Sequence, residues 1–182
     1  MTDAVRTPLA LPVFEAPVKV LIVIAPYYTS IAELQLTGAK STLEGVGAIY
    51  EVIKVPGALE IPTAIGIARR HANHDGYVAL GCVIRGETTH YGTVCAESNR
   101  GLTLLGMAGA CIGNGILTVE DNGQALARAD PAGMDKGGGA AAAALHLIAV
   151  TRHFGTPKGG IGFKPRGAAG PVAGNSKESA PI

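Results

Sequence analysis

The chain has 182 residues, of which 47% are apolar and only 16% charged, and its formal net charge at pH 7 is +1. This length suits one domain with a sizeable core, and the near-zero charge argues against the strongly basic surface of nucleic-acid-binding or membrane-binding proteins. The three cysteines fit neither a zinc-site nor a disulfide spacing, so we expect reduced thiols in a cytoplasmic protein. Neither a signal peptide nor an apolar run near the ~20 residues of a membrane helix is expected.

Apolar runs and helical patterns alternate along the chain. The predicted strands span residues 19–25, 48–55, 77–84 and 114–119, and the predicted helices span 30–44, 58–71, 90–109, 120–129 and 136–153. The first helix has a capping-box pattern, with Ser30 as N-cap and Glu33 three residues later. Short connections between strands and helices predict an α/β fold, a three-layer α/β/α sandwich with a four-stranded parallel sheet in flavodoxin-like order.

Two segments fall outside this alternation, which leaves a single predicted domain at residues 18–154. Residues 1–17 contain three prolines and little periodicity, so we interpret them as a mobile N-terminal arm. Residues 155–182 are rich in glycine, proline, alanine and lysine. Because such a segment buries too little apolar surface to offset its ordering entropy, we predict a disordered tail.

The loop between the strand at 77–84 and the helix at 90–109 is the most informative segment for function. It reads Arg-Gly-Glu-Thr-Thr over residues 85–89 and leads into His90. Ligands of open α/β sheets bind at the carboxyl ends of the strands, and a helix N-terminus offers unpaired N–H groups that suit a phosphate. His90 is therefore placed for acid–base chemistry on a phosphorylated small molecule, with a purely structural role as the alternative.

Three charged residues near predicted helix ends have two interpretations each. Glu60 stabilises the dipole of its helix or accepts hydrogen bonds from sugar-alcohol hydroxyls at the same sheet edge. Arg128 complements the dipole at a helix C-terminus or binds a phosphate with its planar guanidinium. Lys136 precedes a helix start, where a cation is unfavourable, and this conflict indicates an anion to bind.

Two further patterns do not support a site. Residues 113–115 read Gly-Asn-Gly, but they precede a strand, whereas a dinucleotide fingerprint follows a strand and opens a helix. His71 and His74 have the spacing of metal ligands, yet no third ligand lies near them, so we favour a solvated helix end.

Five stretches occur in an order that resembles the lumazine synthase (6,7-dimethyl-8-ribityllumazine synthase) family over roughly residues 18–153. They are residues 55–60 (Val-Pro-Gly-Ala-Leu-Glu), 81–90 (Gly-Cys-Val-Ile-Arg-Gly-Glu-Thr-Thr-His), 114–120 (Asn-Gly-Ile-Leu-Thr-Val-Glu), 125–129 (Ala-Leu-Ala-Arg-Ala) and 136–137 (Lys-Gly). The resemblance implies a transferase of riboflavin biosynthesis. It would condense 5-amino-6-(D-ribitylamino)uracil with 3,4-dihydroxy-2-butanone 4-phosphate, release phosphate and water, and use neither a metal nor an organic cofactor.

The resemblance also implies a set of site residues. His90 would transfer protons, Arg128 would bind phosphate, and Lys136 would lie near it. The positions that would touch the substrates are Tyr27 (stacking on the pyrimidine), Ala58, Leu59 and Glu60 (ribityl chain), Cys82, Val83 and Ile84 (pyrimidine edge), Glu87 and Thr88 (phosphate), and Asn114 (from a neighbouring subunit). Imidazole, guanidinium and carboxylate would then converge on a crevice between two protomers.

The chain departs from the family pattern at several positions. Tyr27 and Asn114 replace common phenylalanines, so we expect a more polar pocket. Residues 129–135 lack the turn linked to icosahedral shells, which favours an isolated homopentamer over a 60-subunit capsid. Riboflavin synthase is a candidate partner, and neither nucleic acid nor membrane is expected as one.

Three alternatives stay open at this point. The first is a flavin- or lumazine-binding protein or assembly subunit that has lost catalysis, against which the retention of His90, Arg128 and Glu60 argues. The second is an archaeal-type riboflavin synthase, which dismutates two lumazines. The third is a response-regulator-like domain, which needs an acidic cluster where this chain has Pro26-Tyr27-Tyr28.

Overall fold

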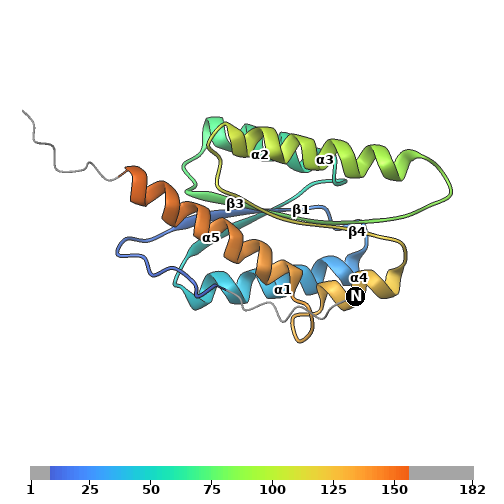
Figure 1. Ribbon diagram of the computed structural model, residues 1–182, viewed down its shortest axis with the longest axis horizontal. Coiled ribbons are helices and arrows are strands. Elements are labelled where there is room, and N and C mark those ends of the chain that lie inside the picture. The colour runs from blue at the N-terminus through green and yellow to red at the C-terminus, as the bar shows by residue number, and fades with distance from the viewer. Residues whose placement is uncertain (1–8, 156–182) are drawn as a thin grey trace, which may run out of the picture.

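The computed structural model describes residues 9–155, which form three layers (Figure 1). The strands are β1 (Lys19–Ile24), β2 (Ile49–Lys54), β3 (Gly76–Ile84) and β4 (Ile112–Val119). The helices are α1 (Thr29–Gly45), α2 (Glu60–His71), α3 (His90–Met107), α4 (Asn122–Ala129) and α5 (Lys136–Gly155). The strands make one parallel sheet in the order β2-β1-β3-β4, with α2 and α3 on one face and α1, α4 and α5 on the other. This confirms the predicted sandwich and its flavodoxin-like order.

Burial of the strands follows from their place in the sheet. β1 and β3 are central and covered on both faces, so they are almost continuously apolar and buried. β2 forms one edge, and its Ile49 and Ile53 are exposed. The helical layers therefore enclose one large apolar cluster on each face of the central strands, and a third cluster lies where α1 and α4 meet the ends of β3 and β4.

Small residues bring α5 unusually close to its neighbours. A methyl group at Gly113 of β4 would overlap the carbonyl oxygen of Ala140, and one at Gly137 of α5 would overlap the carbonyl oxygen of Gln35 in α1. The alanine run in α5 and these glycines thus allow backbone-to-backbone packing on this face of the sheet.

A buried glutamine joins α1 to the sheet, which the sequence did not predict. Gln35 is fully buried, and its Nε2 donates a hydrogen bond of 2.6 Å to the carbonyl oxygen of Gly115. Hydrogen bonding offsets the desolvation of a buried polar group. This bond therefore fixes α1 against β4.

Several helix starts differ from the prediction because the capping residues differ. α1 begins at Thr29 with Tyr28 as its N-cap, so Ser30 lies inside the first turn and the predicted capping box is wrong. α2 begins at Glu60 rather than at residue 58, after a turn in which Glu60 N–H donates to the carbonyl oxygen of Gly57 over 3.2 Å. The N-cap of α4 is Asp121, whose carboxylate accepts from the N–H of Gln124 at 2.8 Å.

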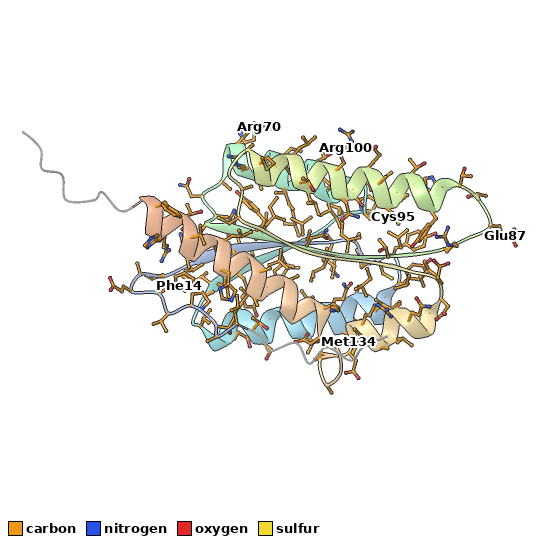
Figure 2. All side chains as sticks on the ribbon, in the orientation of Figure 1. Phe14, Arg70, Glu87, Cys95, Arg100 and Met134 are labelled. Carbon is orange, nitrogen blue, oxygen red and sulfur yellow. The ribbon has the colours of Figure 1, made fainter. Side chains whose placement is uncertain are left out.

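Residues 9–17 form neither helix nor strand, but part of this stretch lies against α5. The Arg152 guanidinium donates hydrogen bonds of 2.9 Å to the carbonyl oxygens of Ala16 and Pro17, and its carbon lies 5.2 Å from the centre of the Phe14 ring (Figure 2). The rest of the predicted arm, residues 1–8, and the predicted tail beyond Gly155 lie outside the described residues. Within residues 9–155, no helix has both the length and the apolar character required to cross a bilayer.

Candidate active site

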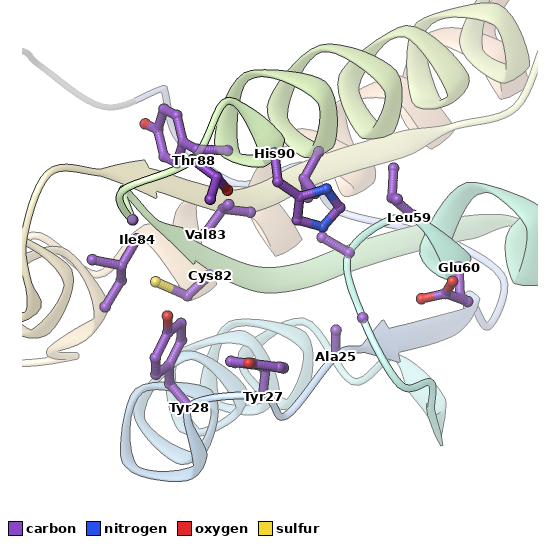
Figure 3. A pocket seen from close by; sticks show the side chains of 15 residues that line it. Ala25, Tyr27, Tyr28, Leu59, Glu60, Cys82, Val83, Ile84, Thr88 and His90 are labelled. Carbon is purple, nitrogen blue, oxygen red and sulfur yellow. The ribbon is translucent and has the colours of Figure 1, made fainter.

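A pocket of about 370 Å³ opens at the carboxyl edge of the sheet. This volume lies within the range of ~300–1,000 Å³ that is common for small-molecule sites. The walls come from the connections that follow β1, β2 and β3 and from the start of α3 (Figure 3). Because parallel strands end at the same edge of a sheet, three separate loops meet at one cavity.

Most of the residues singled out in the sequence line this pocket. They are Tyr27, Ala58, Leu59, Glu60, Cys82, Val83, Ile84, Thr88 and His90. The lining also includes Ala25, Tyr28, Gly57, Gly86, Tyr91 and Val94, which had not been assigned as site residues. Tyr28 and Tyr91 directly follow Tyr27 and His90 in the chain, and this adjacency is the signal that could have found them.

Tyr27, Tyr28 and Cys82 form one side of the pocket. The two tyrosine rings meet edge to face, with centres 5.0 Å apart, and Tyr27 is 74% exposed, so one of its faces is open to a ligand. The Tyr28 hydroxyl and the Cys82 sulfur point toward one another (Figure 3). Burial raises the pKa of the Tyr28 phenol, and it raises the pKa of the Cys82 thiol to about 11. Both groups are therefore neutral near pH 7, and Cys82 is not a nucleophile there.

His90 is the first residue of α3 and lies across the pocket from the tyrosines (Figure 3). No side chain caps the N-terminus of α3, and its first turn contains no acidic residue. The first N–H groups of a helix need a partner, and the positive end of the helix dipole favours an anion. The segment from Gly86 to His90 thus combines an imidazole with a helix start that suits a phosphate.

Glu60 lies at the far side of the pocket from Tyr28 (Figure 3). It opens α2, whose N-cap Leu59 makes no side-chain hydrogen bond. The loop before Glu60 follows β2, and the loop before His90 follows β3. Because β1 lies between β2 and β3 in the sheet, these two loops are not direct neighbours, and the loop that follows β1 and carries Tyr27 and Tyr28 starts between them. The pocket therefore has a carboxylate at one end and aromatic rings at the other.

Four of the predicted site residues do not line the pocket. Glu87 lies at the outer tip of the loop between β3 and α3 and points away from the body of the protein (Figure 2). Asn114 of β4 donates a 2.6 Å hydrogen bond to the Asn99 side chain of α3. The other two, Arg128 and Lys136, belong to the opposite helical layer.

Arg128 and Lys136 are separated from His90 by the sheet. Arg128 is in the last turn of α4, where its Nη1 donates to the carbonyl oxygen of Gln124 at 3.1 Å, and Lys136 is the first residue of α5. Both helices cover the face away from α2 and α3 (Figure 1). Within one chain, guanidinium and imidazole therefore do not converge.

Of the two histidines at the other end of the sheet, His71 is exposed at the end of α2 as predicted, whereas His74 differs from the prediction. His74 lies beyond the end of α2, its side chain is only 7% exposed, and its Nε2 lies 3.5 Å from a carboxylate oxygen of Glu51 in β2. It is thus a buried group rather than part of a solvated helix end. Among residues 9–155, no three histidine, cysteine, aspartate or glutamate side chains gather in a way that could hold a metal ion.

Comparison with known proteins places this chain in a family. The sequence model described as 6,7-dimethyl-8-ribityllumazine synthase matches residues 17–152. The chain is 60% identical to the 6,7-dimethyl-8-ribityllumazine synthase of Jannaschia sp. (strain CCS1) over 169 residues, which cover 93% of this chain and 95% of that protein. It is 55% identical over 136 residues to the synthase of that name from Novosphingobium aromaticivorans, covering 75% of this chain and 98% of that protein. The chain is 52% identical to the Bartonella henselae protein of the same name over 139 residues, which cover 75% of this chain and 90% of that protein.

Proposed function

The chain belongs to the 6,7-dimethyl-8-ribityllumazine synthase family, and we propose that the pocket at the carboxyl edge of its sheet is the site of catalysis. There the enzyme, a transferase of riboflavin biosynthesis, condenses 5-amino-6-(D-ribitylamino)uracil with 3,4-dihydroxy-2-butanone 4-phosphate and releases water and phosphate. The observation that carries the proposal is that one pocket is lined by an aromatic ring, a carboxylate, an imidazole and an uncapped helix start.

Each feature of the pocket matches a part of the two substrates. The exposed face of Tyr27 would stack on the pyrimidine, and Glu60 would accept hydrogen bonds from the ribityl hydroxyls. The segment that contains Thr88 would bind the phosphate of the butanone. The pyrimidine lies closest to the apolar end of the pocket in this arrangement, and the ribityl chain extends toward α2.

In the proposed mechanism, the arylamine attacks the ketone to give an imine with loss of one water, and elimination of phosphate then leaves an enol that tautomerises to a new ketone. Attack of the ribitylamino nitrogen on this ketone, with loss of a second water, closes the ring. Holding both substrates in the reacting orientation supplies much of the acceleration, since such an arrangement is worth ~7–11 kcal/mol. His90 would move protons between the reacting groups, which contributes roughly 10²–10⁴-fold.

We propose further that Asn114, Arg128 and Lys136 serve the pocket of a neighbouring subunit in a homopentamer. The support is geometric, because Arg128 and Lys136 lie on the helical layer opposite the wall that carries His90. A guanidinium from the next subunit would stabilise the departing phosphate. The proposed location is the cytoplasm, supported by the free cysteines Cys82, Cys95 and Cys111.

The first test is steady-state turnover of the full chain with both substrates, followed by lumazine absorbance. We expect His90→Ala to lower kcat by about 10²–10⁴-fold with little change in the KM for the pyrimidine. His71→Ala is the matched control, since His71 is exposed at the opposite end of α2. Binding without product would favour a lumazine-binding protein, and riboflavin made from lumazine alone would favour a riboflavin synthase.

The second test addresses the shared site. Arg128→Ala should raise the KM for the butanone phosphate selectively, whereas an equal rise for both substrates would indicate a folding defect. At butanone phosphate concentrations well below the raised KM of Arg128→Ala, mixing Arg128→Ala with His90→Ala subunits should restore turnover, because about one quarter of the interfaces in randomly mixed rings would pair an intact imidazole with an intact guanidinium. Failure of the mixed rings to exceed either variant would contradict the shared site.

A further inference from the structure

Arg85 is the first residue after β3, and the proposed mechanism gives it no role. Its Nε donates to a carboxylate oxygen of Glu120 at 2.5 Å, and its guanidinium carbon lies 4.2 Å from the centre of the Tyr91 ring. A guanidinium is planar, so it can stack on an aromatic face while it donates a hydrogen bond in its own plane. Arg85 thus contacts the first turn of α3 and the turn between β4 and α4 at once.

On one side, Arg85 reaches the turn that carries the imidazole. Tyr91 follows His90 in the first turn of α3 and lines the pocket. Burial and the nearby Cys95 thiol raise the pKa of Tyr91, so the ring that Arg85 covers is a neutral phenol. The N–H of Arg85 donates to the carbonyl oxygen of Val119 at 2.9 Å. The backbone of Arg85 therefore anchors the start of the loop, and its side chain anchors the end.

On the other side, Arg85 reaches the start of α4. Glu120 precedes that helix, and its N–H donates to the side-chain oxygen of Gln124 at 3.2 Å. The carbonyl oxygen of Gln124 in turn accepts the bond from Arg128. A continuous series of contacts thus runs from the turn that carries His90 to the helix that carries Arg128.

From this series we infer that Arg85 is a positioning residue, which holds the first turn of α3 with His90 in place relative to the Glu120 turn and α4. The inference rests on the proposed function of His90 and Arg128. Because Arg128 would serve a neighbouring subunit, Arg85 connects two adjacent sites of the ring. Its contribution is made through Tyr91 and Glu120, and Arg85 touches neither substrate.

Hydrogen exchange of the assembled full-length protein tests the connection without reference to turnover. Arg85→Met should speed amide exchange in peptides that cover residues 86–95 and 120–129. The matched control is Arg100→Met, because Arg100 also makes an exposed ion pair with a glutamate, Glu97, on the outward side of α3, roughly three turns from His90 (Figure 2). The inference would be overturned if Arg85→Met left amide exchange unchanged in either segment. It would also be overturned if Arg100→Met speeded exchange in both segments as much as Arg85→Met does.

Kinetics test whether the connection acts through His90. Arg85→Met should lower kcat by about three- to thirty-fold, the effect of losing one exposed ion pair and one cation–π contact, without changing the KM for the pyrimidine. Glu120→Gln keeps a hydrogen-bond acceptor for Arg85 and should lower kcat less than Arg85→Met does. In the His90→Ala background, Arg85→Met should cause no further loss, since residues that act as a unit are not additive.

The outcomes separate this inference from the proposed function. Turnover by the wild type together with a full, additive loss from Arg85→Met in the His90→Ala background would overturn the role of Arg85 and leave the function intact. A wild type without turnover would overturn the function, and the exchange experiment would still decide whether Arg85 holds the two segments.

Discussion

At the scale of single residues, burial decides what the polar groups of the pocket can do. Cys82 is 8% exposed in the wall beside Tyr28, and its thiol stays protonated well above pH 7. Glu60, in contrast, is exposed to water at the other end of the pocket. A substrate with an aromatic ring and a polyol chain is complementary to this gradient from apolar to polar.

The raised pKa of Cys82 predicts a dependence of stability on alkaline pH. The thiol pKa is about 11 in the folded protein, against an ordinary value of 9.0. Between these values the unfolded chain releases the proton first, so the free energy of unfolding falls as pH rises from 9 to 11. Urea unfolding across this range should show a steeper decline for the wild type than for Cys82→Ala. Parallel declines would contradict the shifted thiol.

The sequence identified the pocket residues that directly follow strands or open helices, because strand ends of a parallel sheet must meet at one edge. Glu60 and His90, which open α2 and α3, are examples. It did not identify Tyr91, for which the adjacency to His90 was the available signal, because the helical pattern of α3 does not show which residues of its first turn face the cavity. It also misjudged His74, whose burial depends on Glu51 from a different strand and on the nearby Tyr77 ring.

At the scale of elements, two nearby glycines of α5 differ in whether the packing of the helix requires them. Gly137 is buried where α5 meets the backbone of α1 at Gln35. Gly139, two residues later, is exposed, and a methyl group there would meet no atom within 4 Å. The packing of α5 therefore requires glycine at position 137, whereas it would also accept a larger residue at position 139.

The two glycines give a matched pair of substitutions in one helix. Gly137→Ala should destabilise the protein by about 1–3 kcal/mol, because α5 must move away from α1. Gly139→Ala should stabilise it by up to about 1 kcal/mol through its higher helix propensity. Thermal unfolding of both variants measures the contrast, and equal effects would argue against the close contact.

The order and type of the elements followed from the sequence more reliably than their ends did. Continuous apolar runs such as 77–84 predict central strands whatever their surroundings, since burial on both faces demands them. Helix starts depend on which single residue caps the first turn. Tyr28 is the N-cap of α1, without a side-chain hydrogen bond, although Ser30 has the better capping side chain.

At the scale of the whole molecule, several large apolar side chains of the helical layer formed by α2 and α3 are exposed. Ile67 of α2 is 48% exposed, and Leu104 and Met107 of α3 are 58% and 85% exposed. The chain also carries few charges for its length. Both observations favour an assembly that covers part of this layer.

Light scattering coupled to size exclusion tests the proposed assembly. We expect a mass five times that of the 18.4-kDa chain, and dilution should not change it while the protein stays folded. A particle of sixty chains would replace the isolated pentamer with a closed shell. A monomer would remove the neighbouring subunit that the shared site requires.

The central position of β1 also has a consequence for how the polypeptide reaches this structure. After its first residue, Lys19, β1 contains no charged side chain and consists mostly of β-branched residues. Its partner β3 begins more than fifty residues later in the chain, as the pairing of Val20 with Gly76 shows. Parallel pairing over such a separation forms late, and an unpaired strand of this composition readily associates with its own kind. Renaturation from denaturant should therefore lose yield as the protein concentration increases, through intermolecular β-association that competes with closure of the sheet.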